Sequence, residues 1–472
     1  MSTACVILAA GLGKRMKSGV PKVLHRICGV TMLESVAGAA RKVNAERIVV
    51  VAGEHMDAIK KSLEAEDVVF AHQKEAKGTG HALMCARPAL RDFRGTVIVL
   101  NGDTPLIGHE TIKRLLRLHL RGKNALSVLS FKAKHPEGYG RIVRDEAGRL
   151  SAIVEEKDAD PSQKKICEVN SGVYVFEHDA LSLLDSLRMN KAKGEYYLTD
   201  IVAEAAKRGR DLSAYCIGAE EEFMGVNTRE ELALASLLMR ELIAKRWAGK
   251  GVNFIDPGSV FIHAGVVIGR DTTIYPNVHL EGRTKIGSGA TIFPNVRILN
   301  SEIGPGAVIK DSTVIEDSKV MDRAAIGPFA HLRPGSKVGT EAKVGNFVEL
   351  KKAVIGKASK ASHLSYLGDT VIGRRVNVGA GTITCNYDGV NKYKTVLGDG
   401  VFIGSDTQLV APVKIGRGAY VGAGSTITED VPPGALALSR TRQKNIRGWA
   451  KKRESALKSK KLENLPGKRK GR

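Results

Sequence analysis

Apolar runs alternate with helix-like segments over the first 227 residues. The segments Thr31 to Val43 and Glu110 to Arg121 repeat their apolar residues with helical spacing. The apolar runs, each long enough for one strand, are Cys5 to Ala10, Arg47 to Val51, Val68 to Ala71, Thr96 to Leu100, Ala125 to Phe131 and Ser171 to Phe176. This alternation predicts an α/β domain over residues 1–227 with a mainly parallel sheet. Substrates bind such domains at the carboxyl ends of the strands.

A single long helix is predicted for residues 228–250. Thr228 and Glu231 have the spacing of a capping box, in which each side chain binds a free backbone N–H at the start of a helix. Gly249 and Gly251 mark its end. Its apolar positions are Leu232, Leu234, Leu237, Leu238, Leu242 and Trp247. About 20 residues at 1.5 Å each would form a linker of roughly 30 Å between domains, and a coiled-coil contact is the alternative interpretation.

From Val252 onward the apolar residues recur every six positions. The ladder reads Ile268, Ile274, Leu280, Ile286, Ile292 and Ile298; then Ile303, Ile309 and Ile315; then Ile326, Leu332, Val338, Val344 and Leu350; then Ile403, Leu409, Ile415, Val421 and Ile427. Neither an amphipathic helix nor a hairpin sheet keeps this period, so we expect a parallel β-helix over residues 251–450. Residues 381–394 leave the pattern and should form a projecting loop.

Composition narrows the class of protein. The chain has 472 residues, 43% hydrophobic and 26% charged, which excludes wholesale disorder. Aromatic residues make up only 5%, which argues against a nucleic-acid binder that stacks bases. No stretch provides the roughly 20 apolar residues of a membrane span. Six scattered cysteines without a CxxC pair suit reduced thiols, so we expect a cytoplasmic protein with no membrane span.

The first predicted strand runs into a Gly-rich turn with clustered cations. The string Leu-Ala-Ala-Gly-Leu-Gly-Lys-Arg-Met over residues 8–16 is followed by Pro-Lys-Val-Leu over residues 21–24. Such a turn offers backbone N–H groups and positive charge to a nucleotide. It lacks the Gly-Lys-Ser/Thr ending that a P-loop needs. It is not a dinucleotide fingerprint either, because Met16 stands where the third Gly belongs. The whole string resembles the signature of the sugar-phosphate nucleotidyltransferases.

That resemblance extends along the first domain and implies a Rossmann-like nucleotidyltransferase. It implies that Arg15 and Lys22 stabilise the triphosphate and that Asp103 and Asn227 hold Mg²⁺, which prefers oxygen ligands. The implied substrate-binding residues are Leu8, Ala9, Ala10, Gly11, Lys22, Gln73, Gly78, Thr79, Asn101, Gly102, Asp103, Gly140, Glu155, Asn170 and Asn227. Taken alone, a strand-end Asp is more often a helix cap, and residues 78–80 a turn. The chain departs from the family at Leu12 and Lys14, where the positive charge has moved by two positions.

Four motifs in the second half resemble the left-handed β-helix acyltransferases. They are His-Leu-Arg-Pro-Gly at 331–335, Val-Gly-Asn-Phe-Val-Glu-Leu-Lys-Lys at 344–352, Ser-His-Leu-Ser-Tyr-Leu-Gly-Asp at 362–369 and Gly-Ala-Gly-Thr-Ile-Thr-Cys-Asn-Tyr-Asp-Gly at 379–389. Transfer of an acetyl group to a sugar amine needs a base, and a neutral imidazole suits pH 7. The resemblance selects His363, and His331 is interpreted as structural. Cys385 is interpreted as a bystander.

Taken together, the motifs from about residue 4 to residue 449 resemble the bifunctional N-acetylglucosamine-1-phosphate uridyltransferase and glucosamine-1-phosphate acetyltransferase family. This resemblance implies that glucosamine 1-phosphate is held by Arg333, Lys351, Tyr366 and Asn377. It implies that the acetyl-CoA groove is lined by Ala380, Asn386, Tyr387, Ser405, Ala423 and Arg440. On their own, the small residues of that groove would be ordinary corner residues of a β-helix, and the two cations would be solvated charges.

The implied function is the synthesis of UDP-N-acetylglucosamine, a cell-wall and lipopolysaccharide precursor. Acetyl transfer from acetyl-CoA to glucosamine 1-phosphate would precede uridylyl transfer from UTP to N-acetylglucosamine 1-phosphate, with release of pyrophosphate. The resemblance also implies a homotrimer that requires no nucleic acid. Two alternatives stay open: a nucleotidyltransferase for another sugar with the β-helix as a scaffold, and a non-catalytic exchange-factor subunit. The intact motifs disfavour both.

The net charge of +23 predicts anionic partners and divides unevenly along the chain. Residues 451–472 contain ten basic and two acidic residues, a net charge of +8, which leaves +15 for the rest. The larger share suits the phosphorylated substrates. The +8 at residues 451–472 indicates a flexible basic tail. This tail is either simply solvated or in contact with nucleic acid or an anionic membrane.

Overall fold

The computed structural model describes residues 2–63, 67–190 and 194–463. Its contacts divide the chain into two compact units, Met1–Arg323 and Ala324–Arg472. The division falls inside the region with the six-residue period, so the first unit contains the α/β part, the long helix and the first coils of the repeat.

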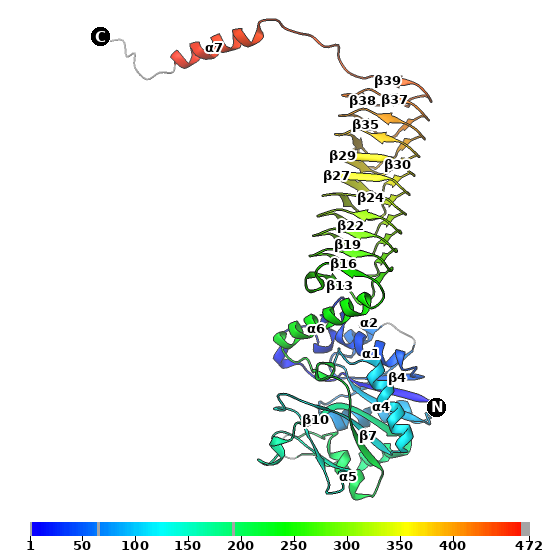
Figure 1. The fold of residues 1–472 in the computed structure, drawn as a ribbon, viewed down its shortest axis with the longest axis vertical. Coiled ribbons are helices and arrows are strands. Elements are labelled where there is room, and N and C mark those ends of the chain that lie inside the picture. The colour runs from blue at the N-terminus through cyan, green and yellow to red at the C-terminus, as the bar shows by residue number, and fades with distance from the viewer. Residues whose placement is uncertain (1, 64–66, 191–193, 464–472) are drawn as a thin grey trace, which may run out of the picture. The chain divides into compact units, whose positions relative to one another are not determined.

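The α/β part of the first unit is built on one mixed sheet (Figure 1). Its main strands lie in the order β11-β7-β10-β6-β1-β4-β5. Their bounds are β1 Thr3–Leu8, β4 Arg47–Ala52, β5 Val68–His72, β6 Thr96–Asn101, β7 Leu126–Lys132, β10 Glu168–Glu177 and β11 Leu212–Cys216. All six predicted strands are present. Strand β10, however, runs antiparallel to both β6 and β7, a direction that the alternation of strands and helices did not predict.

Smaller elements complete this part. The helices are α1 Met32–Lys42, α2 Met56–Leu63, α3 Gly78–Ala86, α4 His109–Gly122 and α5 Asp200–Lys207. The short strands are β2 Arg26–Ile27, β3 Val30–Thr31, β8 Arg141–Arg144 and β9 Leu150–Val154. The 3-10 turns are η1 Lys14–Met16, η2 Lys22–Leu24, η3 Arg87–Leu90, η4 Gln163–Lys165, η5 His178–Ser186, η6 Glu220–Phe223 and, beyond the long helix, η7 Pro257–Ser259.

Both faces of the sheet are buried. Val6 and Val49 belong to one apolar cluster, whereas their neighbours Ile7 and Ile48 belong to the other. Successive side chains of a strand point to opposite faces, so these continuous apolar runs need cover on both sides. The helices supply that cover, and the polar strand ends stay at the carboxyl edge of the sheet.

The long helix α6, Arg229–Ala248, confirms the predicted capping box. The backbone N–H of Glu231 donates to Thr228 Oγ1 at 3.1 Å, and the N–H of Thr228 donates to Glu231 Oε2 at 3.0 Å. The helix packs against β2 on one side and against β13, Phe261–Ile262, on the other. The Arg240 guanidinium lies 4.0 Å from the centre of the Phe261 ring. The helix is therefore packed against its neighbours within the first unit.

The six-residue period builds coils of parallel strands in each unit (Figure 1). Ile274 pairs with Ile292, so one coil takes three six-residue steps. Every residue of the predicted ladder is buried, none more than 5% exposed. In the first unit the strands are β12 Asn253–Phe254, β13, β14 Val267–Ile268, β15 Thr273–Ile274, β16 His279–Glu281, β17 Lys285–Ile286, β18 Thr291–Ile292, β19 Arg297–Leu299, β20 Glu302–Ile303, β21 Val308–Ile309, β22 Val314–Glu316 and β23 Lys319–Val320.

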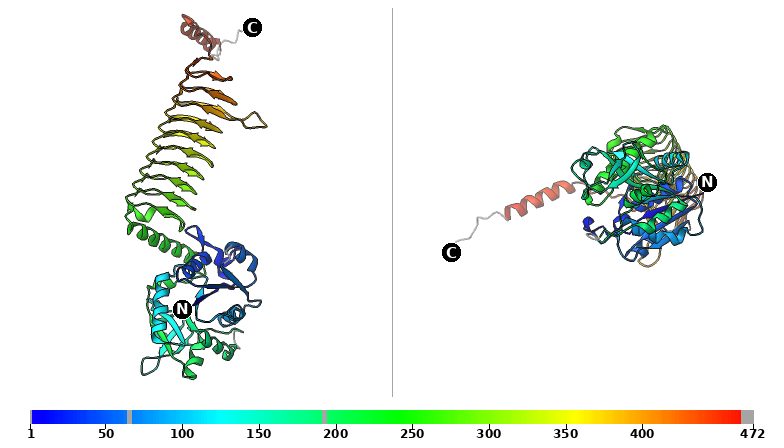
Figure 2. Two further views of the ribbon diagram at one scale, coloured as in Figure 1. Left: turned by 90° about the vertical axis from the view of Figure 1, so that its right-hand side faces the viewer. Right: turned by 90° about the horizontal axis from the view of Figure 1, so that it is seen from below.

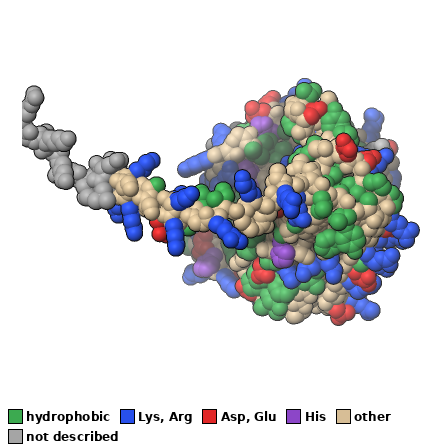
Figure 3. All heavy atoms as spheres, turned by 90° about the horizontal axis from the view of Figure 1, so that it is seen from above, with side chains coloured by type: hydrophobic (Ala, Val, Ile, Leu, Met, Phe, Trp, Pro, Cys, Tyr) green, Lys and Arg blue, Asp and Glu red, His purple; other side chains and the backbone are tan. Residues whose placement is uncertain are grey.

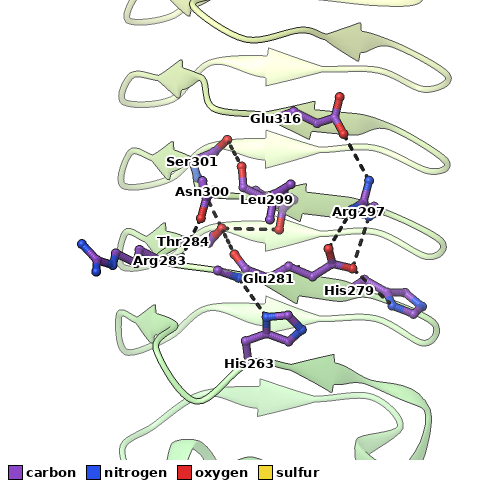
Figure 4. A network of polar contacts seen from close by, with 12 residues as sticks. His263, His279, Glu281, Arg283, Thr284, Arg297, Leu299, Asn300, Ser301 and Glu316 are labelled. Carbon is purple, nitrogen blue, oxygen red and sulfur yellow. Dashed lines mark hydrogen bonds and ion pairs between the residues drawn. The ribbon is translucent and has the colours of Figure 1, made fainter. Parts of the chain in front are cut away.

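Polar side chains cross-link the outside of the first coils (Figure 4). The guanidinium of Arg297 in β19 donates to Glu281 of β16, at 2.8 Å from Nη2, and to Glu316 of β22, at 3.2 Å from Nη1. This pairing holds the pKa of Glu281 below its usual value, chiefly through the hydrogen bond from Arg297. Three successive coils are thus tied together on their solvent side.

The second unit continues the same architecture, a left-handed parallel β-helix, with longer strands at its centre. The strands are β24 Ala325–Ile326, β25 His331–Leu332, β26 Lys337–Val338, β27 Lys343–Lys351, β28 Val354–Ile355, β29 Lys360–Gly368, β30 Thr370–Ile372, β31 Asn377–Val378, β32 Ile383–Cys385, β33 Thr395–Leu397, β34 Phe402–Ile403, β35 Gln408–Val410, β36 Val413–Ile415, β37 Tyr420–Val421, β38 Thr426–Ile427 and β39 Leu436–Ala437. Strands β27 and β29 have nine residues each, where most others have two or three.

Two features of the second unit depart from the repeat. The loop predicted at residues 381–394 is present: Tyr387 and Lys392 form an antiparallel bridge, and the segment projects from the coils in the left view of Figure 2. Residues Trp449–Glu463 form helix α7, which the sequence did not predict. Lysine and arginine side chains are spread along α7 (Figure 3). Residues 464–472 of the predicted tail lie outside the described residues, and the flexibility of the tail stays a prediction.

Candidate active sites

A cleft of about 800 Å³ opens at the carboxyl ends of β1 and β6. Thirteen of the predicted nucleotidyltransferase residues line it: Leu8, Ala9, Ala10, Gly11, Arg15, Lys22, Gln73, Gly78, Thr79, Asn101, Asp103, Glu155 and Asn227. Leu12 and Lys14, where the chain departs from the family pattern, also line it, together with Val23, Ala76, Ala82, Glu195 and Tyr197, which were not among the predicted site residues. The predicted residues therefore meet in one cavity although they are spread over more than two hundred positions.

The Gly-rich turn that forms one wall depends on Gly13. This residue has a φ of +62°, in the left-handed region that side chains disfavour. A Cβ atom at this position would lie 2.6 Å from the Cβ of Lys22. Gly13 thus allows the turn to pack directly on η2, and this packing brings Lys22 to the cleft.

Lys22 is the centre of a small polar cluster in this cleft. Its Nζ donates to Asp103 Oδ2 at 2.5 Å and to Asn227 Oδ1 at 3.0 Å. The side chain of Lys22 is only 11% exposed and that of Asp103 24%. A backbone hydrogen bond of 2.9 Å from Val226 N–H to the Asp103 carbonyl holds the two segments together. Two oxygen atoms from distant segments therefore converge on one positive charge.

Gln73, Gly78 and Thr79, three of the predicted substrate-binding residues, are held by hydrogen bonds at the start of α3. Gln73, which is buried, donates from Nε2 to the carbonyl of Gly78 at 3.0 Å. Thr79 Oγ1 accepts the N–H of Leu198 at 3.2 Å. The turn at Gly78 has a φ of +89°, and a Cβ there would meet the Tyr196 carbonyl at 2.6 Å. These contacts leave little freedom to the wall that Gln73 and Thr79 form.

Gly140, Glu155 and Asn170, which are also predicted to bind substrate, form a second group. The N–H of Asn170 donates to the carbonyl of Gly140 at 2.8 Å, and Thr199 Oγ1 donates to Glu155 Oε1 at 2.9 Å. A Cβ at Gly140 would lie 3.8 Å from both Asn170 and Glu155. Gly140 and Asn170 are therefore neighbours of Glu155 but do not themselves line the cleft. Gly102 does not line it either, because it packs beneath with its N–H on the Leu8 carbonyl at 2.9 Å.

In the second unit, the predicted base His363 lies on β29 with its side chain exposed. Its Nδ1 is 2.8 Å from Oδ1 of Asn346 on β27. Tyr366 lies on the same strand, and Asn377 on β31 pairs with Lys360 of β29. The motif residues of the acetyl site thus come from neighbouring coils.

Three cations gather near this strand. Arg333 pairs with Glu349 at 2.9 Å, and the ammonium group of Lys351 lies close to that of Lys392 in the projecting loop. The ammonium of Lys392 lowers the pKa of Lys351, and the charge of Arg333 adds to the effect. The sequence analysis missed Lys392, although its place in the loop that leaves the six-residue period was a usable signal. The nearby positive charges thus disfavour the charged form of Lys351.

The predicted acetyl-CoA residues form a row along one edge of successive coils. The carbonyls of Ala380, Ser405 and Ala423 accept hydrogen bonds from Asp406 N–H at 2.7 Å, Gly424 N–H at 2.9 Å and Arg440 Nη1 at 3.0 Å. In the loop, Asn386 Nδ2 donates to Asp369 Oδ2 at 2.6 Å, and Tyr387 is exposed. The structure brings Ala380, Ser405, Ala423 and Arg440 into one continuous line. Asn386 and Tyr387 lie on the projecting loop.

Comparison with known proteins identifies the family. Residues 5–168 match the model of the MobA-like NTP transferase domain, and residues 265–300 and 394–429 match that of the bacterial transferase hexapeptide (six repeats). Three relatives, each described as "Bifunctional protein GlmU", come from Thermodesulfovibrio yellowstonii, Pelobacter propionicus and Clostridioides difficile. They are 49%, 49% and 47% identical to this chain over 95%, 95% and 96% of its length and 99%, 98% and 98% of theirs. This chain belongs to the GlmU family.

Membership in the GlmU family makes the chain a bifunctional transferase, with nucleotidyltransferase and acetyltransferase parts. The two family models match the two parts in which the candidate sites were found. All six cysteines are free. Within the described residues, no helix is long and apolar enough to cross a membrane.

Proposed function

We propose that this chain makes UDP-N-acetylglucosamine in two steps. Acetyl transfer from acetyl-CoA to glucosamine 1-phosphate takes place on the β-helix, and uridylyl transfer from UTP to N-acetylglucosamine 1-phosphate takes place in the α/β cleft. The observation that carries the proposal is the convergence of the motif residues: those of each half-reaction meet in space, within one compact unit each.

In the uridylyl step, a phosphate oxygen of the sugar phosphate attacks the α-phosphorus of UTP. A P–O bond forms, the bond to the β-phosphate breaks, and pyrophosphate leaves with its electron pair. No protein nucleophile is required, so the chain contributes orientation and positive charge. Lys22 and Arg15 line the cleft and supply that charge, while Gln73 and Thr79 hold the base and Glu155 the sugar.

The oxygen pair of Asp103 and Asn227 fits a divalent cation. Both oxygens already share one positive charge, the ammonium of Lys22, and carboxylate and amide oxygens are the ligands that Mg²⁺ prefers. When bound, Mg²⁺ would neutralise charge on the triphosphate. Among the described residues, no group of three or more His, Cys, Asp or Glu side chains is arranged to hold a metal ion, so we expect the phosphates and water to complete the shell.

In the acetyl step, His363 acts as the base. The amine of the sugar attacks the thioester carbonyl of acetyl-CoA and the C–N bond forms. The C–S bond breaks, CoA leaves as a thiolate with the electron pair of that bond, and the amine proton passes to the imidazole. The phosphate of glucosamine 1-phosphate lies between Arg333, Lys351 and Lys392, where it removes the repulsion between the two lysines. Tyr366 and Asn377 hold the sugar.

Acetyl-CoA lies along the row that begins at Ala380 and ends at Arg440. The small residues Ala380, Ser405 and Ala423 leave space for the extended pantetheine arm, and Arg440 supplies charge for its phosphates. Asn386 and Tyr387 cover the acetyl end from the projecting loop. The thioester would thereby reach His363 from the edge of the coils.

We further propose the division into a uridylyltransferase domain (1–227), a linker helix (228–250), an acetyltransferase β-helix (251–450) and a basic tail (451–472). The molecule works in the cytoplasm as a homotrimer and requires no nucleic acid. Its product feeds peptidoglycan and lipopolysaccharide synthesis.

The decisive test supplies glucosamine 1-phosphate, acetyl-CoA, UTP and Mg²⁺ and follows the products by mass spectrometry. We expect N-acetylglucosamine 1-phosphate first and UDP-N-acetylglucosamine afterwards. Separate assays with each pair of substrates assign each half-reaction. Formation of a nucleotide sugar without any acetyl transfer would leave the β-helix as a scaffold, and absence of both products would overturn the proposal.

A further inference from the structure

We infer that Asn346 is a positioning residue for acetyl transfer, because its amide holds the imidazole of His363 in the tautomer that can act as a base. The family motif selects His363 but gives no role to Asn346. The inference rests on the proposed function, since it takes His363 as the base. It is carried by the hydrogen bond between Asn346 Oδ1 and His363 Nδ1, at 2.8 Å.

The two residues face each other because of the register of the coils. Strands β27 and β29 are parallel neighbours, and Asn346 pairs directly with His363. Side chains at paired positions of neighbouring parallel strands leave the sheet on the same face. The contact is therefore set by the backbone of the β-helix and does not depend on a mobile loop.

The backbone at this point is built for a close approach. A Cβ atom at Gly345 would lie 1.9 Å from the carbonyl oxygen of Ser362, so only glycine allows the two strands to lie this near. The next residues in line, Phe347 and Leu364, both have left-handed backbones, with φ of 56° and 39°. Left-handed residues recur at the turns of many coils, Phe329 among them, so this backbone belongs to the regular geometry of the repeat and fixes the positions of Asn346 and His363.

The chemistry of the contact selects one tautomer. A carbonyl oxygen can only accept, so Nδ1 of His363 must carry the hydrogen that it donates to Asn346. A neutral imidazole has one N–H, so Nε2 keeps its lone pair and takes the amine proton while the C–N bond forms. If the amide were turned round, its NH₂ group would donate to Nδ1, the hydrogen would sit on Nε2, and no base would face the substrate.

Two substitutions separate this role from a purely structural one. Asn346→Leu keeps a similar volume and removes the acceptor, so kcat for acetyl transfer should fall about 10²-fold with little change in KM. Asn346→Asp keeps an acceptor oxygen in the same place and should retain most of the activity. Lys343→Ala, an exposed substitution on the same strand, should leave acetyl transfer unchanged. Uridylyl transfer, measured on the same samples, reports that each variant is folded.

The tautomer itself is visible by nitrogen-15 NMR of protein labelled at histidine, with His363→Ala used to assign the signals. We expect the protonated nitrogen of His363 to be Nδ1 in the wild type and in Asn346→Asp. In Asn346→Leu we expect a shift toward the Nε2-protonated form. A wild type protonated at Nε2, or full kcat in Asn346→Leu, would overturn the inference.

Failure of the inference and failure of the proposed function give different results. If His363→Ala keeps its acetyl transfer, the base has been misassigned and the role of Asn346 falls with it. If His363→Ala is inactive but Asn346→Leu is fully active, the proposed function stands and only the positioning role is rejected.

Discussion

The two candidate sites are assembled in opposite ways. In the α/β cleft, Lys22 contacts Asp103 and Asn227, which lie 81 and 205 positions further along the chain. On the β-helix, Asn346 contacts His363 at a separation of 17, and Ala423 contacts Arg440 at the same separation. One coil of the second unit spans about this distance, since paired residues are 17 positions apart in β27 and β29 and 16 apart in β37 and β39. The cleft therefore depends on the packing of the whole sheet, whereas the second site is set by the register between coils.

The substitution with the largest expected effect tests whether the two candidate sites work separately. His363→Ala should lower acetyl transfer by about 10²- to 10⁴-fold, the usual contribution of a general base, and leave uridylyl transfer unchanged. Both rates are measured on the same preparation by following the two products. His331→Ala is the matched control and should stay active. Equal losses in both half-reactions would contradict two separate sites.

A substitution in the α/β cleft should have the opposite selectivity. Asp103→Asn removes a carboxylate from the oxygen pair in the cleft, and uridylyl transfer should fall by about 10³-fold because several kcal/mol of charge stabilisation depend on it. Acetyl transfer should not change. Asp92→Asn serves as the control, because it makes the same change at a residue that pairs with Arg47 and does not line the cleft. Normal uridylyl transfer in Asp103→Asn would remove this residue from the mechanism.

The repeat itself can be broken by a single cavity. Ile292 is fully buried and lies between Ile274 and Ile309 of the neighbouring coils. Ile292→Ala should lower the free energy of unfolding by about 2 to 5 kcal/mol, through lost apolar contact and the cavity left behind. Thr291→Ala, on the outward side, should change it by less than about 0.5 kcal/mol. Denaturant titration of both variants measures the difference.

The projecting loop can be tested through the charge of Lys392. Lys392→Ala should raise the KM for glucosamine 1-phosphate by roughly 10-fold, the cost of one charge-assisted hydrogen bond. Lys351 binds phosphate only while it is protonated, so binding weakens as the pH rises through its lowered pKa. Removing Lys392 removes the main cause of that shift, and the loss of binding should move to higher pH.

A profile of KM against pH for the wild type and Lys392→Ala measures this effect. Lys394→Ala, which makes the same charge change in the same loop, is the control. An unchanged KM in Lys392→Ala would place the phosphate elsewhere.

The smallest effect is expected at the end of the chain. A variant without residues 451–472 should keep both activities within about twofold, because helix α7 lies outside both sets of candidate residues. Steady-state assays of the two half-reactions measure this directly. A selective loss of acetyl transfer would instead assign the basic segment to the acetyl-CoA site.

Local signals in the sequence were reliable where one residue pair or one repeat period is enough to predict an element. The capping box of Thr228 and Glu231 and the buried ladder through Ile298 and Leu350 were confirmed in the structure. The direction of β10 was not predictable, because strand direction follows from the path of the chain between strands and not from the strand's own residues. Helix α7 was missed because its sequence has no apolar face.

The residues alone were enough to predict the α/β part, the long helix, the β-helix and the motif residues of two candidate sites, because side-chain periodicity and short motifs are local properties. Three results required the folded chain: the convergence of Lys22, Asp103 and Asn227, the contact between Lys351 and Lys392, and the hydrogen bond from His363 to Asn346. Each joins residues whose distance depends on packing and register, which no single stretch of sequence contains.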